Sequence, residues 1–171
     1  MLKLSDRFGF ELLKDTLGEK LIVEINLENI LHLLAYADLY QVTGLLNECC
    51  TFIDQRAEDV LCNDNILTVS DHVLKVILSR DSLCVPEVLI FQTVVRWKES
   101  NEVTREKMKG VLDCVRLTEI SPRMLFGEIE KSCLFESESI MKALRAQNLP
   151  DFELMRPRGR KCKYNNANNI V

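Results

Sequence analysis

Glycine and proline are scarce in this chain, with 6 glycines and 4 prolines among 171 residues. A chain with so few turn-forming residues is neither loop-rich nor disordered overall. It also lacks runs in which polar and apolar residues alternate, which argues against β-strands. No apolar run approaches the length of a membrane-spanning helix, so we expect no membrane partner. Hydrophobic residues make up 47% of the chain, enough for a substantial core.

The spacings that mark metal or catalytic sites are missing too. The 7 cysteines include no Cys-x-x-Cys pair, and the adjacent Cys49 and Cys50 cannot both point one way on a helix. His32 and His72 lie in no metal-ligand pattern, and no serine or cysteine sits in a nucleophile elbow. We therefore expect no catalytic residue, no metal and no cofactor. Without a signal peptide or a disulfide framework, the cysteines indicate reduced core thiols in a cytoplasmic protein.

Positive charge is concentrated at the C-terminal end. Residues 156–171 hold five Lys and Arg residues and no acid. Because the whole chain carries −4, removing these five charges leaves −9 on residues 1–155. Such an acidic body argues against nucleic-acid binding. The basic, asparagine-rich end fits a linker or disordered tail better than a nuclear-localisation or nucleic-acid patch.

Helical periodicity dominates the rest of the chain and predicts an all-α fold. The expected helices begin at Asn26, Thr43, Ser70, Pro86, Thr104, Ser121 and Ser137, with caps at Asn26, Thr43 and Ser70. The Thr104 helix should end near Leu117 and the last helix near Gln147. The apolar patch at 21–23 is interpreted as a linker that anchors into the core. A weak repeat between residues 5–13 and 37–45 favours a solenoid-like bundle of stacked helix pairs.

The segment from Leu78 to Trp97 is the most informative one. It describes a helix end, a short loop and a new helix that starts on Pro86, where a missing N–H costs nothing. Glu87 suits the positive end of that helix. Phe91 and Trp97 contribute to its apolar side, and Trp97 should be buried.

The sequence of this segment resembles the signature of the BACK domain, which follows the BTB/POZ domain in adaptors of cullin-3 ubiquitin ligases. Core leucines are also found at the expected positions Leu61, Leu67 and Leu74, while Leu89 and Thr93 replace the commoner acid and alanine. The signature positions are Arg80, Asp81, Pro86, Glu87, Phe91, Trp97 and Arg116. By itself, the pair Arg80-Asp81 fits a salt bridge or a helix C-terminal cap, and Asp81 also fits a role in holding the following loop.

The resemblance implies a domain plan. Residues 1–18 look like the last helices of a BTB domain, and 19–150 like a BACK domain. Within it, the helix pair 26–57 is similar to the three-box that joins BTB to BACK and helps to grip cullin-3. Residues 151–171 would be the tail. We expect the chain to be a middle piece of a longer protein.

The resemblance also implies a non-enzymatic interaction and spacer module in a cullin-3 adaptor. Cullin-3 would bind mainly through the missing BTB part, which would also form a homodimer, and an unknown substrate protein would bind elsewhere. The candidate partner-binding residues, on the polar faces of the 26–57 pair, are Glu28, His32, Tyr36, Asp38 and Tyr40. The main alternative is a BTB-BACK scaffold that assembles partners without a ligase role. A transcriptional role is disfavoured, since no zinc-finger spacing is present and the body is acidic.

Overall fold

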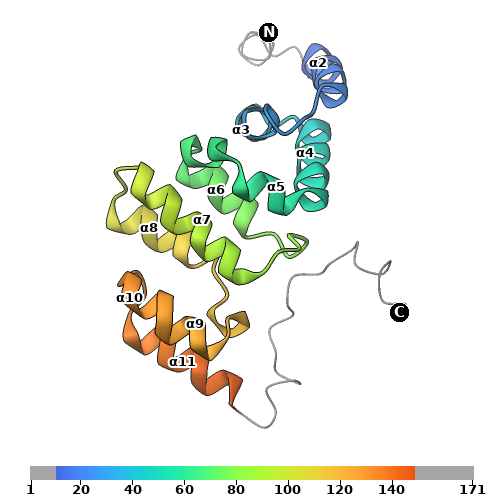
Figure 1. Cartoon of the computed structure of the whole chain (residues 1–171). Coiled ribbons are helices and arrows are strands. Elements are labelled where there is room, and N and C mark those ends of the chain that lie inside the picture. Colours follow the sequence, from blue (N-terminus) through green and yellow to red (C-terminus); the bar gives the residue numbers. More distant parts are fainter. Residues whose placement is uncertain (1–10, 149–171) are drawn as a thin grey trace, which may run out of the picture.

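The protein is described here by a computed structural model that places residues 11–148 (Figure 1). Within these residues every regular element is helical, so the predicted all-α fold is confirmed. Figure 1 shows the helices stacked in chain order, from α2 at one end to α11 at the other. The predicted BTB portion falls partly outside the described residues, and the predicted tail 151–171 falls wholly outside them.

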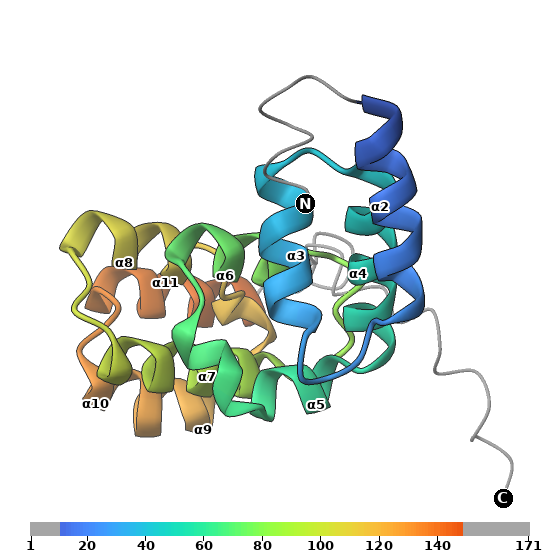
Figure 2. The same ribbon diagram turned by 90° about the horizontal axis from the view of Figure 1, so that it is seen from above.

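Three helices form the first group: α2 (Glu11–Val23), α3 (Ile30–Leu39) and α4 (Thr43–Gln55). Figure 2 shows α2 and α3 antiparallel, and both pack against α4. The patch at 21–23, interpreted from sequence as a linker, is the last turn of α2. Gly18 helps to explain this difference: a Cβ there would lie 2.7 Å from Val42 Cγ1, so α2 approaches the start of α4 very closely. The helix itself therefore brings the partly buried Leu21 and Ile22 to the core.

Asn26 closes a turn rather than capping α3. Its Oδ1 atom accepts hydrogen bonds from the backbone N–H groups of Glu28, at 2.9 Å, and Asn29, at 3.1 Å. The helix begins only at Ile30. Asparagine offers the backbone this local alternative to helix, which is why the start of α3 was predicted too early.

The other two predicted caps have different outcomes. Ser70 caps α6 as expected, because its Oγ atom accepts a hydrogen bond from the Val73 N–H at 3.3 Å. Thr43 does not cap α4. It is the first helical residue, and Val42 stands at the N-cap without a side-chain hydrogen bond.

The middle of the stack contains α5 (Ala57–Cys62), the short 3-10 helix η1 (Asp64–Thr68), α6 (Asp71–Leu78), α7 (Glu87–Ser100) and α8 (Arg105–Leu112). Pro86 immediately precedes α7, within one residue of its predicted place. The helix α8 ends at Leu112, five residues before the predicted end at Leu117.

The last group opens with the 3-10 helix η2 (Leu117–Glu119). A nearly continuous helix follows, made of α9 (Pro122–Met124), the π-helical segment η3 (Leu125–Ile129) and α10 (Glu130–Ser132). The final helix, α11 (Ser137–Gln147), has its predicted bounds. Gln147 fixes its end, because the Nε2 atom donates to the carbonyl oxygens of Thr118 and Ile120, at 2.8 and 2.7 Å.

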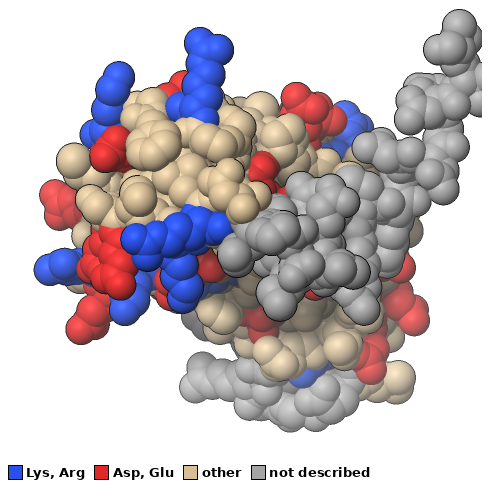
Figure 3. Space-filling view, turned by 90° about the horizontal axis from the view of Figure 1, so that it is seen from below, with Lys and Arg blue, Asp and Glu red and all other residues tan. Residues whose placement is uncertain are grey.

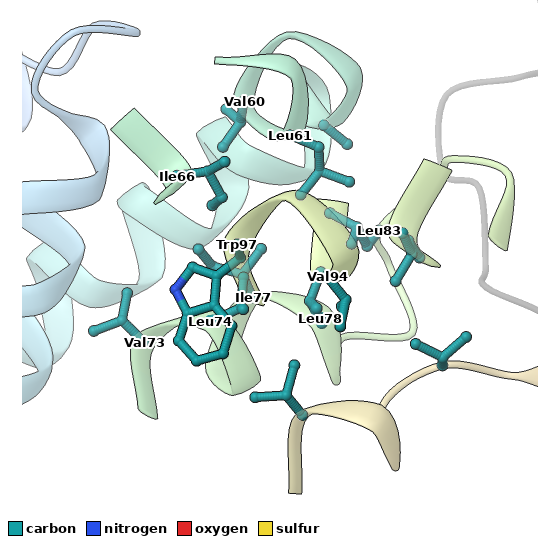
Figure 4. Close-up of a cluster of buried hydrophobic side chains, with 14 of the residues drawn as sticks. Val60, Leu61, Ile66, Val73, Leu74, Ile77, Leu78, Leu83, Val94 and Trp97 are labelled. Atoms are coloured by element: carbon teal, nitrogen blue, oxygen red, sulfur yellow. The ribbon is translucent and has the colours of Figure 1, made fainter. Parts of the chain in front are cut away.

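Trp97 lies in the core, only 2% exposed, as predicted. Figure 4 shows its indole ring among apolar side chains of α6, with Val73, Leu74 and Ile77 labelled. The indole N–H donates to the Val69 carbonyl at 2.9 Å, so the polar end of the ring is satisfied. This hydrogen bond connects α7 to the residues just before α6.

Candidate functional site

The outer side of α3 and the turn before it carry three of the five candidate partner-binding residues. Glu28 and His32 are exposed, and Tyr36 is 51% exposed. Leu39, at 66% exposed, extends the same stripe, since the steps of four and three residues from His32 to Tyr36 and Leu39 stay on one helical face. Glu28 lies in the turn just before this helix. The stripe can therefore offer a partner apolar area beside an acid and an imidazole.

Tyr36 and Tyr40 form the rigid part of this surface. Their rings stack with centroids 6.2 Å apart and planes 11° from parallel. Tyr40 also ends α3, where its N–H donates to the Tyr36 carbonyl at 2.9 Å. A pair of tyrosines held in this way offers contact area at a small cost in conformational entropy, as in many protein interfaces.

Asp38 does not belong to the outer stripe. It is half-buried, and its Oδ2 atom lies 2.8 Å from Nε2 of His72, on α6. Asp38 thus connects α3 to the next part of the stack. Leu39, by contrast, was missed in the sequence analysis, although its spacing from His32 and Tyr36 was the signal that would have found it.

Arg80 and Asp54 form the first of two ion pairs at the signature loop. The Arg80 Nε atom donates to Asp54 Oδ1 at 3.0 Å, and its second nitrogen, Nη2, donates to Oδ2 at 2.6 Å. Asp54 is only 8% exposed, and its carboxylate raises the pKa of Arg80 above the ordinary value. This two-point contact joins the end of α4 to the loop after α6. Arg80 also contacts Ser82, because its Nη2 atom donates to the Ser82 Oγ atom at 3.2 Å.

The second pair involves Asp81 and Arg116. The Arg116 guanidinium donates to the Asp81 carboxylate, and the Arg116 backbone N–H donates to Glu87 Oε2 at 3.1 Å. Glu87 is only 6% exposed. Arg80 and Asp81 therefore both form ion pairs, each with a partner on a distant part of the chain. The signature residues in this way join α4, the 79–86 loop, the start of α7 and the chain before η2.

Phe91 belongs to the packing of the stack. It is buried on α7, and its ring centroid lies 6.3 Å from that of Phe135. Together with Trp97 it places two aromatic rings of the signature inside the molecule. The apolar signature residues thus support the fold around the ion pairs.

The cysteines only partly follow the expectation. Cys49 and Cys50 are buried free thiols, whereas Cys62 and Cys133 are free but exposed. Cys84 is disulfide-bonded. Reduced core thiols are therefore found at the adjacent pair, and the expectation is wrong for Cys84, which is not a free thiol, and for Cys62 and Cys133. The two exposed thiols were misplaced because helical spacing alone does not decide which side of a short helix or loop meets the core.

Across residues 11–148, no three His, Cys, Asp or Glu side chains gather in a way that would hold a metal ion. No helix among these residues is both long and apolar enough to cross a bilayer. On the face shown in Figure 3, the Lys and Arg side chains of the described residues are mixed with Asp and Glu around an uncharged area.

Comparison with known families gives one decisive match. Residues 30–130 match the family model for BACK, described as "BTB And C-terminal Kelch". The chain belongs to the BACK family. The matched BACK residues run from the start of α3 to the first residue of α10, so they include His32, Tyr36 and Leu39 of the outer stripe and both signature ion pairs.

Curated relatives of this BACK chain have names that contain BTB or Kelch, as the family description does. It is 31% identical over 147 residues to BTB/POZ domain-containing protein 9 of Rattus norvegicus, covering 86% of this chain and 24% of the relative. The Homo sapiens protein of that name is 30% identical over the same length and the same shares. Kelch-like protein 2 of Homo sapiens is 28% identical over 131 residues, covering 75% of this chain and 22% of the relative. The chain thus spans about a quarter of the length of these relatives.

Proposed function

We propose that this chain is a non-enzymatic interaction and spacer module of a BTB-BACK substrate adaptor for a cullin-3 ubiquitin ligase. The observation that carries the proposal is the outer stripe of α3, with Tyr36 and Leu39 exposed and Tyr36 stacked on Tyr40. An exposed apolar patch with charged residues beside it is typical of a protein-binding surface. Cullin-3 would meet this stripe, with its larger contact on a BTB domain.

The spacer role is supported by the connections between successive helices. The Asp54–Arg80 pair joins the first helix group to the middle of the stack, and Asp81–Arg116 joins the middle to the last group. A stiff arm of this kind would hold a substrate at a set distance and orientation from the ligase. Ubiquitin transfer benefits because both effective concentration and orientation are then controlled.

The remaining parts of the proposal concern the longer protein. Residues 1–18 would be the last helices of a BTB domain, which would form the homodimer and most of the cullin contact. The BACK domain would occupy 19–150, with 26–57 as its three-box-like pair. An unknown substrate protein would be bound by another domain, and the adaptor would work in the cytoplasm without a cofactor, a membrane or a nucleic acid.

Calorimetry with purified cullin-3 tests this proposal. The chain alone should bind weakly, with a Kd of ~10 μM or poorer, because a half-interface still loses translational and rotational freedom. Joining it to a BTB domain should tighten binding. In that longer protein, Tyr36→Ala and Glu28→Lys should each weaken binding by about tenfold, as central contacts do.

A matched control is Lys142→Glu, an exposed charge change on α11 at the far end of the stack (Figure 1), which should leave the Kd unchanged. Nanomolar binding by the chain alone would show that the interface has been assigned to the wrong surface.

The alternative is a BTB-BACK scaffold that assembles partners without a ligase role. The same stripe and the same connected helices would serve it equally well. No gain in cullin-3 affinity on adding the BTB domain would favour this scaffold.

A further inference from the structure

A groove runs between α7 and the helix formed by η3 and α10, far from the α3 stripe. Its volume is about 690 Å³, and its lining is mostly apolar. The residues that line it are Phe91, Gln92, Val95, Arg96, Gly127, Glu128, Lys131 and Ser132. A volume of this size accommodates several amino-acid side chains.

The π-helical segment η3 shapes one wall of the groove. A π turn inserts an extra residue into a helix, and such turns recur at functional sites. Leu125 and Ile129 remain buried, so the core side of the helix is intact. On the groove side, a Cβ added to Gly127 would meet nothing within 4 Å. The groove is therefore open at the point where the helix departs from regular α geometry.

The charged residues that line the groove are Arg96, Glu128 and Lys131. Arg96 turns away toward Asp64, to which its Nη2 atom donates at 2.9 Å. Lys131 is exposed and forms no ion pair with another residue of the described part of the chain. Glu128 lies almost one turn before Lys131, so an acid of the occupant would be placed at the Lys131 end.

We propose that this groove binds residues 149–155 of the same chain. Their sequence is Leu149-Pro150-Asp151-Phe152-Glu153-Leu154-Met155. Apolar side chains would fill the groove over Phe91 and Val95, and the carboxylates of Asp151 and Glu153 would lie near Lys131. The proposal rests on this complementarity of charge and polarity and on where the described chain ends.

The segment is long enough to reach the groove. Gln147 holds the end of α11 against residues 118–120, just before Pro122. At about 1.5 Å per helical residue, Gly127 lies about 8 Å along the helix from Pro122, and Ser132 about 15 Å. Seven extended residues span about 23 Å. The segment can therefore pass around the end of the helix and still cover the groove.

Photo-crosslinking in the full chain tests the proposal. Phe152 is replaced by p-benzoylphenylalanine, and products are mapped by mass spectrometry in a mixture of isotopically light and heavy chains. We expect crosslinks within one chain, to residues 91–96 or 127–132. Crosslinks that map elsewhere, or that join light to heavy chains, would overturn the proposal and indicate another site or a second copy as occupant.

Two groove variants make the test specific. Gly127→Leu places a side chain in the open space and should abolish these crosslinks. Lys131→Glu should lower their yield about threefold, the size that one exposed ion pair supports, and adding Glu153→Lys should restore it. Lys142→Glu is the charge-matched control and should have no effect. Crosslinks that persist in Gly127→Leu would contradict the assignment, and the charge swap decides the matter if that variant fails to fold.

Discussion

Asp54 is one of the few charged residues buried in the described part of the chain, and Arg80 is its partner. Replacing Arg80 by methionine would leave the carboxylate buried without its guanidinium. We expect Arg80→Met to lower the free energy of unfolding by about 3 kcal/mol, because an uncompensated buried charge is costly. Urea unfolding followed by circular dichroism measures this loss.

Arg56→Met is the matched control for that change. Arg56 also pairs with an aspartate, Asp59, at 2.8 Å, but both side chains are about half exposed. Solvent screens such a pair, so the loss should stay below ~1 kcal/mol. Equal losses in the two variants would show that burial of Asp54 contributes nothing to the strength of its ion pair.

The adjacent thiols should be far less reactive than the exposed ones. Burial, together with the neighbouring Cys50 and Glu48, raises the pKa of Cys49 to about 12, and burial also raises the pKa of Cys50. A raised pKa keeps a thiol protonated, and only the thiolate is alkylated readily. Iodoacetamide labelling near pH 8, read by peptide mass spectrometry, should modify Cys62 and Cys133 at least about a hundredfold faster than Cys49. Comparable rates would contradict the burial of the pair.

At the scale of elements, the packing of α2 on α4 depends on a glycine. Gly18→Ala would bring a methyl group against Val42, so we expect a loss of about 1 kcal/mol despite the better helix propensity of alanine. Thermal or urea unfolding measures the change.

Gly44→Ala, in the first turn of α4, is the matched control. A Cβ there meets nothing within 4 Å, and alanine should stabilise the chain by about 0.5 kcal/mol. If Gly18→Ala were as stabilising as Gly44→Ala, the close approach of α2 and α4 would be wrong.

At the scale of the whole molecule, a stack of helices should open from its ends. Leu74 and Ile77 of α6 and Ile90 and Val94 of α7 are fully buried, whereas Leu12 of α2 is 82% exposed. Hydrogen exchange read by mass spectrometry should therefore be slowest in α6 and α7 and faster in α2 and α11. Uniform protection along the chain would instead indicate one all-or-none unit.

Some features followed from the sequence because they depend on residues within one or two turns. The apolar spacing that buries Ile140 and Leu144 gave α11 its bounds, and Ser70 capped its helix as expected. The same logic predicted Glu28, His32 and Tyr36 on the polar faces of the 26–57 pair, and all three are exposed. At Asn26 the sequence pattern could not predict the helix start, since an asparagine can either close a turn with its side chain or cap a helix.

By itself the sequence determined the helical class, the place of the signature loop and many of the buried apolar positions, because periodicity and capping act locally. Only the tertiary structure decided that Arg80 pairs with Asp54, 26 residues away, that Arg116 pairs with Asp81, and that Asp38 turns to His72. An ion pair depends on where two helices cross, and a groove such as that beside Gly127 depends on how a π turn repositions a helix wall. Neither an ion pair between distant residues nor a groove shows as a periodic pattern in the sequence, so both are decided only when the helices pack.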